Sequence, residues 1–124
     1  MSILAVRIPV STSGSSGSAT GTGSFAVAGE LVDVYLDYHA SAPGSTTDVT
    51  IAAPGNPASR DLLVITDNAT DGWFTPGAQM RNAAGAAVTG AYTSPVIHGG
   101  VLTVDVAQSD ALTDAVIAYC FIRI

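Results

Sequence analysis

The sequence predicts an all-β protein, an antiparallel β-sandwich with jelly-roll topology. Apolar segments are short, and several of them alternate apolar and polar side chains with a period of two. Gly, Pro, Asn and Asp interrupt these segments at short intervals, which is typical of the turns between strands. No helical segments alternate with the expected strands, so a parallel α/β fold is not supported. We therefore expect about eight or nine short strands in a single sandwich.

The N-terminal residues form the first expected strand. Ile3–Val10 has the sequence ILAVRIPV, in which every second residue is apolar. Since successive side chains of a strand point to opposite faces, one face of this strand is wholly apolar. That face carries Leu4, Val6, Ile8 and Val10.

A Gly/Ser-rich segment follows, and it allows two interpretations. Ser11–Ser24 (STSGSSGSATGTGS) contains no charged, aromatic or large aliphatic side chain. It is either a long loop, because loop-closure entropy grows slowly with length, or the tether of an N-terminal arm that pairs with a neighbouring subunit or partner. We favour the arm, and so divide the chain into residues 1–24 (strand and arm) and residues 25–124 (one sandwich domain). The arm's candidate partner-binding residues are Ile3, Val6 and Ile8.

The strand expected at Glu30–His39 shows the clearest alternation in the chain, after a short one at residues 24–29. The core face is predicted to carry Val32, Val34, Leu36 and Tyr38. The opposite face is predicted to carry Leu31, Asp33, Tyr35, Asp37 and His39. Two aspartates on this second face indicate that it meets water or a polar partner.

Further apolar segments complete the sandwich. Strands are expected within residues 46–53, 61–67, 79–82, 86–92, 95–108 and 115–124. A hairpin turn is expected at Asn82–Gly85, and a kink or bulge at Gly99-Gly100. The last strand, AVIAYCFIRI, is apolar on both faces apart from Arg123. A short helix over Ser109–Ile117, capped by Ser109 or Asp110, is the alternative for the segment that precedes it.

The charge pattern argues against nucleic acids and membranes as partners. The chain has ten acidic residues, four arginines and no lysine, and its net charge is −6. Phosphate-rich partners are bound by clustered Lys and Arg, whereas the arginines here are scattered singly. No segment has the length or character of a signal peptide or a membrane span. We expect synthesis in a cytoplasm and, because so few charges keep copies apart, self-association or another protein partner.

The sequence contains no arrangement typical of catalysis or of a cofactor site. His39 and His98 are single, and no Gly-x-Ser-x-Gly motif is present. Cys120 is the only cysteine, lies in an apolar segment and is expected to be buried. Asp67–Gly72 (DNATDG) is rich in side-chain oxygens, but the spacing of a calcium loop is missing and turn formation is the simpler explanation. We therefore predict a non-enzymatic protein without metal or cofactor.

Trp73 and Phe74 are the remaining candidates for partner binding. They lie side by side in an expected loop bounded by Gly72 and Pro76. Three interpretations stay open: a plug for the open end of the sandwich, an aromatic anchor for a partner protein, or a platform on which a sugar stacks.

Three segments give the chain a resemblance to a known family. Residues 29–51, 62–92 and 94–124 are built of short Ala-, Gly- and Thr-rich strands and turns, and they resemble the small head-decoration (cement) proteins of tailed bacteriophages. The resemblance implies binding to the outer surface of an expanded capsid, where such proteins bridge subunits of the major capsid protein. It also implies a dimer or trimer, carried on the virion exterior after synthesis in the cytoplasm of a bacterial host.

Two other function classes remain open. One is a carbohydrate- or receptor-binding jelly roll of a fibre or surface protein, which predicts that Trp73, either alone or with Tyr92, is exposed in a groove. The other is a shell or pilus-like subunit that polymerises through its own edge strands. A decoration protein is expected to stay a small oligomer until capsids are supplied.

Overall fold

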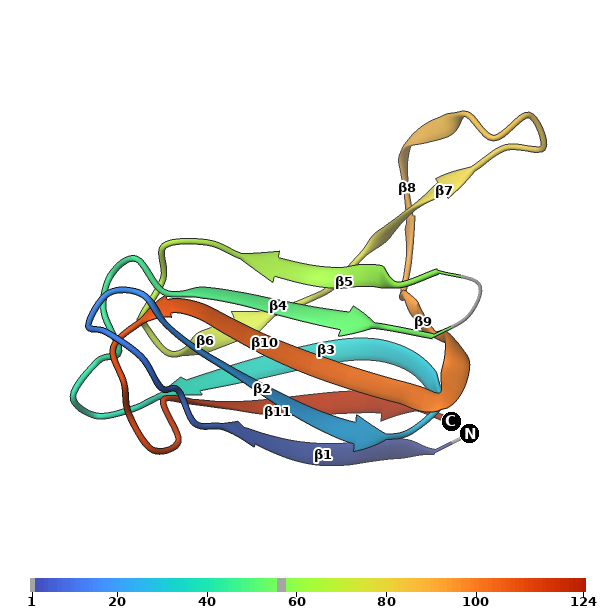
Figure 1. The fold of residues 1–124 in the computed structure, drawn as a ribbon. Coiled ribbons are helices and arrows are strands. Elements are labelled where there is room, and N and C mark those ends of the chain that lie inside the picture. Colours follow the sequence, from blue (N-terminus) through green and yellow to red (C-terminus); the bar gives the residue numbers. More distant parts are fainter. Residues whose placement is uncertain (1, 56–57) are drawn as a thin grey trace.

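The computed structural model describes residues 2–55 and 58–124, and it is built almost entirely from β-strands (Figure 1). The strands are β1 (Ile3–Val10), β2 (Ala19–Ala26), β3 (Gly29–Tyr38), β4 (Asp48–Ala53), β5 (Arg60–Ile65), β6 (Gly72–Phe74), β7 (Ala78–Arg81), β8 (Ala87–Thr93), β9 (Val96–Ile97), β10 (Val101–Ser109) and β11 (Val116–Arg123). A single 3₁₀ turn, η1 (His98–Gly100), precedes β10. The predicted all-β class is confirmed.

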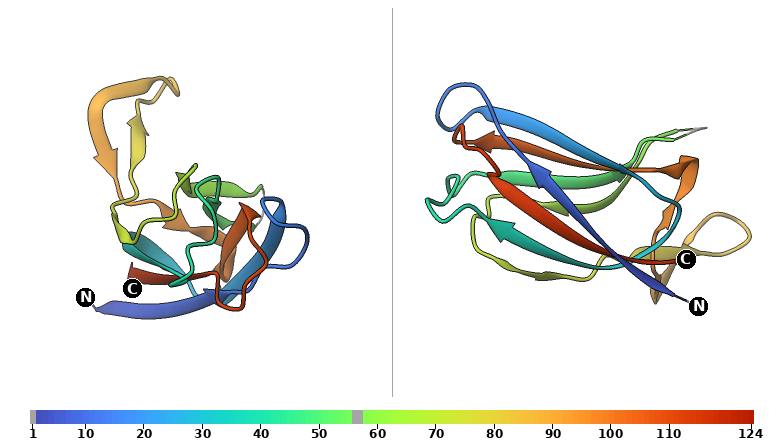
Figure 2. Two further views of the ribbon diagram at one scale, coloured as in Figure 1. Left: turned by 90° about the vertical axis from the view of Figure 1, so that its left-hand side faces the viewer. Right: turned by 90° about the horizontal axis from the view of Figure 1, so that it is seen from below.

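All of these strands except β7 and β8 form two antiparallel sheets that pack face to face (Figures 1 and 2). One has the order β1-β11-β3-β6, with β9 also paired to β3, and the other has the order β2-β10-β4-β5. The pairing is nested along the chain, because β1 pairs with β11, β2 with β10, β3 with β6, and β4 with β5. This nested order is that of a jelly roll, as the sequence predicts.

The core lies between the two sheets and is filled by branched aliphatic side chains. In β11 every second residue is buried, and β10 and β1 alternate in the same way over most of their lengths. Each such side chain contributes about 1.5–3 kcal/mol when it is removed from water. The largest side chains that are fully buried are Leu31, Leu36, Ile51, Ile97, Leu102, Ile122, Val10, Val34, Val49, Val104, Val106 and Val116.

The N-terminal segment belongs to the sandwich. Ile3–Val10 pairs with β11 of the same chain along its whole length, and β2 begins at Ala19, inside the Gly/Ser-rich segment, and pairs with β10. Residues 1–24 thus supply strands to both sheets, and the expected boundary at residue 24 separates no structural units. Val6 and Ile8 are 3% and 2% exposed, so the structure places them in the core, where they are not available to a partner. Ile3 is exposed.

The glycines of β2 allow the two sheets to approach closely. A Cβ atom on Gly21 would lie 2.0 Å from the backbone oxygen of Ser11, and one on Gly23 would lie 2.9 Å from the backbone oxygen of Pro9. No side chain fits at either distance. The turn before β2 is fixed by Asp110, whose carboxylate accepts hydrogen bonds from the Ser16 hydroxyl (2.6 Å) and the Gly17 amide (3.0 Å). The segment therefore has a flexible composition but a defined conformation.

Three other expectations differ from the structure. A β-bulge lies at Val32, because Leu31 and Asp33 oppose the adjacent residues Ile122 and Phe121. This bulge turns Leu31, not Val32, into the core. The alternative helix over residues 109–117 does not form, since β10 extends to Ser109 and β11 begins at Val116. Trp73 and Phe74 lie in the short strand β6 instead of a loop.

Strands β7 and β8 form a hairpin that projects from the sandwich (Figure 1). The expected turn at its tip is confirmed: the Gly85 amide donates to the Asn82 carbonyl and the Asn82 amide to the Ala86 carbonyl, both at 2.9 Å. The hairpin is inserted between β6 and β9, outside the nested pairs of the jelly roll.

Candidate binding surface

The outer face of the β1-β11-β3-β6 sheet is unusually apolar for a sheet surface. Antiparallel sheets commonly bury one apolar face and present a polar one to water. In β11 the outward residues Ile117, Tyr119 and Phe121 are large and half-buried. This face therefore resembles a surface that another molecule covers.

A single row of side chains crosses this face from edge to edge. Arg7 of β1 lies opposite Tyr119 of β11, Tyr119 opposite Tyr35 of β3, and Tyr35 opposite Trp73 of β6. We call these four residues the aromatic row. Directly opposed residues lie close enough for their side chains to touch, so the row forms one continuous strip.

The rings of the row contact one another at tilted angles. The centroids of Tyr35 and Trp73 are 5.0 Å apart, with an interplanar angle of 59°, and those of Tyr35 and Tyr119 are 6.4 Å apart. The ring centroids of Trp73 and Phe121 are 5.5 Å apart. These separations are typical of favourable aromatic pairs, which hold the rings in place without a partner.

The structure separates the two neighbouring aromatics that the sequence singles out. Phe74 packs partly buried against the core, as a plug would. Trp73 points outward, and 61% of its surface is exposed. Phe74 therefore contributes to the core, whereas Trp73 does not and stays a candidate for partner binding.

Two aspartates lie on the same face as the exposed tryptophan. Asp33 is outward-facing on β3, where its carboxylate accepts hydrogen bonds from its neighbour's amide, Val34 N–H (3.1 Å), and from the Thr75 hydroxyl (3.4 Å). Asp37 lies opposite Ile117 on the same face. Two carboxylates of the inner strand β3 thus lie among the apolar residues of this face.

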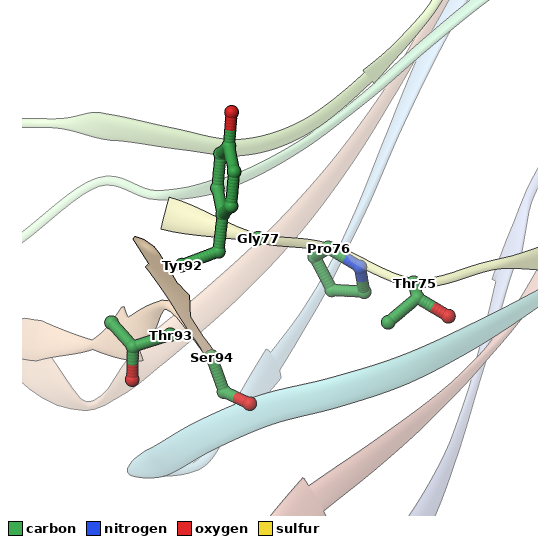
Figure 3. A pocket seen from close by; sticks show the side chains of 6 residues that line it. All are labelled: Thr75, Pro76, Gly77, Tyr92, Thr93 and Ser94. Atoms are coloured by element: carbon green, nitrogen blue, oxygen red, sulfur yellow. The ribbon is translucent and has the colours of Figure 1, made fainter. Parts of the chain in front are cut away.

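A pocket lies at the base of the β7–β8 hairpin, beyond Thr75 (Figure 3). Its volume is about 510 Å³. Figure 3 shows the segment through Thr75, Pro76 and Gly77 facing the segment through Tyr92, Thr93 and Ser94, and these six residues line it. Tyr92 is 63% exposed. The lining is uncharged and rich in hydroxyl groups.

The remaining polar candidates have structural partners. His39 Nδ1 accepts a hydrogen bond from the Ser41 amide (3.0 Å), and His98 Nε2 lies 2.6 Å from the Ala58 carbonyl oxygen. In the loop at residues 67–72, Asp71 accepts a hydrogen bond from the Tyr38 amide (2.7 Å) and Asn68 donates to the Tyr38 hydroxyl (3.1 Å). Within residues 2–55 and 58–124 there is no group of His, Cys, Asp and Glu that would hold a metal.

Cys120 and Tyr38 are shielded from solvent. Burial raises the pKa of the Cys120 thiol from 9.0 to about 12. Burial is also the main cause that raises the pKa of Tyr38, opposed by the hydrogen bond from Asn68. A thiol that stays protonated is a poor nucleophile, so Cys120 acts as a core residue.

Among the described residues no helix is long and apolar enough to cross a membrane.

Comparison with known proteins finds only distant structural similarity. No protein-family model and no curated protein matches the sequence. Among solved structures, the CBM32 of AlyQ in complex with 4,5-unsaturated mannuronic acid matches with a TM-score of 0.46 and 10% identity, over 89% of this chain and 74% of that one. The family 32 CBM of C. perfringens NanJ in complex with galactose matches at 0.43 and 11%, over 96% and 93%. A putative alpha-L-fucosidase from Bacteroides thetaiotaomicron matches at 0.48 and 9%, over 94% of this chain and 22% of that one.

Sequence reasoning found Trp73 but missed the residues around it. In the sequence, Tyr35, Tyr119 and Phe121 are recognisable only as parts of expected strands. The sequence of the last strand gives one signal for this surface. The strand is apolar on both faces, and the face turned away from the core needs an apolar contact of its own. The pairing that brings Tyr119 between Arg7 and Tyr35 joins residues far apart in the chain, and only the fold reveals it.

Proposed function

We propose that this protein is a non-enzymatic structural protein that docks on the surface of another protein through its aromatic row. The observation that carries the proposal is the row itself, in which one Arg, two Tyr and one exposed Trp follow each other across four strands. Trp, Tyr and Arg are the residue types enriched at the energetic centres of protein interfaces.

The geometry of the row favours a protein surface as the partner. The aromatic rings are held by contacts with one another and by a rigid sheet, so little side-chain entropy is lost on binding. Asp33 and Asp37 add polar groups to the same face, and protein interfaces combine apolar residues with polar contacts. The neighbouring apolar residues Ile117 and Phe121 extend the contact beyond the row.

We further propose that the partner is the major capsid protein of a tailed phage, bound on the capsid exterior. This part of the proposal comes from the sequence resemblance to head-decoration proteins. The chain's composition is compatible with that position, because an acidic, lysine-free protein with a net charge of −6 is repelled by packaged DNA and suits the outer surface.

The test compares two single substitutions. Trp73→Ala removes the most exposed residue of the row, and Val64→Ala is the control, since Val64 is also well exposed (53%) but lies on β5 of the other sheet. Stoichiometric co-sedimentation is measured with expanded, undecorated capsids of the phage whose genome carries this chain. We expect Trp73→Ala to weaken binding at least about tenfold and Val64→Ala to leave it unchanged. Equal binding by wild type and both variants, or no binding at all, overturns the proposal.

A carbohydrate is the second candidate ligand, and the pocket at the base of the hairpin favours it. Its aromatic wall, Tyr92, and its hydroxyl groups, from Thr75, Thr93 and Ser94, suit an uncharged sugar. Tyr92 and Trp73 are both exposed, but only Tyr92 lines this pocket, so the sugar would contact Tyr92 and not Trp73. Binding to a glycan array that Tyr92→Ala abolishes, with no retention on capsids, would replace the first proposal by this one.

A further inference from the structure

The β7–β8 hairpin is an addition to a jelly roll that is complete without it. The nested pairs from β1–β11 to β4–β5 close both sheets, and β7 and β8 pair only with each other in the described chain. Figures 1 and 2 show the hairpin extending away from both sheets. Its role is therefore not to cover the core of its own sandwich.

The hairpin is exposed on both of its faces. Apart from Ala78 and Ala91, which are half-buried, every residue of β7 and β8 is exposed. The exposed residues include the apolar side chains Met80 (49%) and Val88 (39%). An isolated two-stranded hairpin is at best marginally stable in water. A hairpin of this kind gains most of its stability by packing its apolar side chains against another surface.

The charge distribution indicates what that surface is. All ten acidic residues lie outside residues 72–104, the region that contains the hairpin. The hairpin's one charged residue is Arg81, which uses one N–H to donate to the Gly85 carbonyl across the turn (2.9 Å). The hairpin is thus weakly cationic, whereas the rest of the same chain is strongly acidic, and the two parts are complementary between copies.

We propose that the β7–β8 hairpin is an arm that packs against the acidic sandwich of a second copy of this chain. Met80 and Val88 supply the apolar contact, and Arg81 faces the carboxylates of the neighbour. This assignment does not depend on the aromatic row, which lies on the outer face of a sheet. The self-association through the hairpin and the docking through the row can therefore be tested separately.

The test uses two matched valines. Val88→Asp places a carboxylate in the hairpin, and Val64→Asp places the same group on β5, outside it. Sedimentation velocity of the full chain is measured from micromolar to hundreds of micromolar protein. We expect a reversible oligomer in the wild type and in Val64→Asp, and a dissociation constant raised at least about tenfold in Val88→Asp. Met80→Asp should act as Val88→Asp does, and Arg81→Glu should weaken association most at low salt.

Thermal melts of all variants at low protein concentration separate lost association from lost folding. If Val88→Asp or Met80→Asp does not fold, Arg81→Glu decides, since it changes an exposed side chain in a strand that has no core contact. A wild type that stays monomeric throughout the range overturns the proposal. The proposal is also overturned if the wild type forms an oligomer that no hairpin substitution weakens. It is overturned as well if the hairpin is needed for binding to capsids but not for self-association.

Discussion

The sandwich and the projecting hairpin use similar residues for opposite purposes. Both are rich in Gly, Ala and Thr. In the sandwich, Gly21 lies against the backbone just beyond the end of β1, so that a Cβ atom would lie 2.0 Å from the Ser11 carbonyl oxygen. In the hairpin, Gly85 and Gly90 have no atom within 4 Å of such a position, and both have positive φ angles, 82° and 76°. Small residues thus permit close packing in one region and turning of the chain in the other.

This difference separates the residues that determine the fold from the residues that are free to contact other molecules. Side chains that meet backbone atoms of distant segments hold the two sheets together. Side chains that contact nothing within their own chain contribute little to its fold and are free to contact another molecule. Substitutions in the two regions should therefore differ in what they affect.

The largest effect is expected from Gly21→Ala. The added Cβ overlaps the Ser11 carbonyl, and the strands must separate to accept it. Since the clash is with backbone and not with the end of a flexible side chain, we expect a loss of about 3 kcal/mol or more in the free energy of unfolding. Urea denaturation followed by circular dichroism measures it.

The control is Gly77→Ala at the base of the hairpin. There the nearest atoms to a new Cβ are in Tyr92 at 3.8 Å, an ordinary contact. We expect a change within about 1 kcal/mol in either direction. If Gly21→Ala were as mild as Gly77→Ala, β2 would not lie against the end of β1, and the tether interpretation of the N-terminal segment would return.

The N-terminal segment shows why the positions of strands are easier to predict from sequence than the pairing between strands. Ile3–Val10 was assigned from its own alternation, and the structure has the same bounds. The meaning of Ser11–Ser24 depended on what lies beside it, and composition alone favoured a flexible tether. Only the long-range pairings β1–β11 and β2–β10 show that its glycines fit a gap between two sheets.

A second, intermediate effect concerns the buried thiol of the sandwich. The folded-state pKa of Cys120 is raised to about 12 from an ordinary value of 9.0. The unfolded chain therefore loses this proton first, and above pH 9 it binds fewer protons than the native state. The stability that burial of the neutral thiol contributes is complete below pH 9 and declines as the pH rises toward 12. The slope is on the order of 1 kcal/mol per pH unit.

Urea titrations of the wild type and of Cys120→Ala between pH 8 and pH 11 measure this decline. The variant should be less stable at neutral pH because of the lost packing, yet its stability should fall less steeply above pH 9. Tyr38, whose pKa is also raised, contributes a further decline above its ordinary value of 10.0 that both proteins share. Equal slopes in the two proteins would contradict burial of the thiol in solution.

The candidate surface is predictable only in part, because it too depends on which strands lie side by side. Trp73 stood out as the only tryptophan, and its neighbour Phe74 was included because the two adjacent residues were expected in one loop. In a strand, however, adjacent side chains point to opposite faces, which separates the pair. The bulge at Val32 similarly moved Leu31 into the core, and no local pattern marks that position.

The smallest effect on folding is expected where the hairpin is removed altogether. Ala78 and Thr93 lie directly opposite each other at its base, so the flanking residues Gly77 and Ser94 are close in space. The chain from Ala78 to Thr93 can therefore be replaced by a short Gly-Ser turn without moving β6 or β9. Because its side chains contribute little to the core, we expect the free energy of unfolding to change by no more than about 1 kcal/mol, measured in urea at a protein concentration at which the wild type is monomeric. At higher concentration the wild type should gain stability from association and the shortened protein should not, so the difference between the two should grow with concentration. A loss of several kcal/mol in the monomer would mean that the hairpin supports its own sandwich, and the distinction between the two regions would not hold.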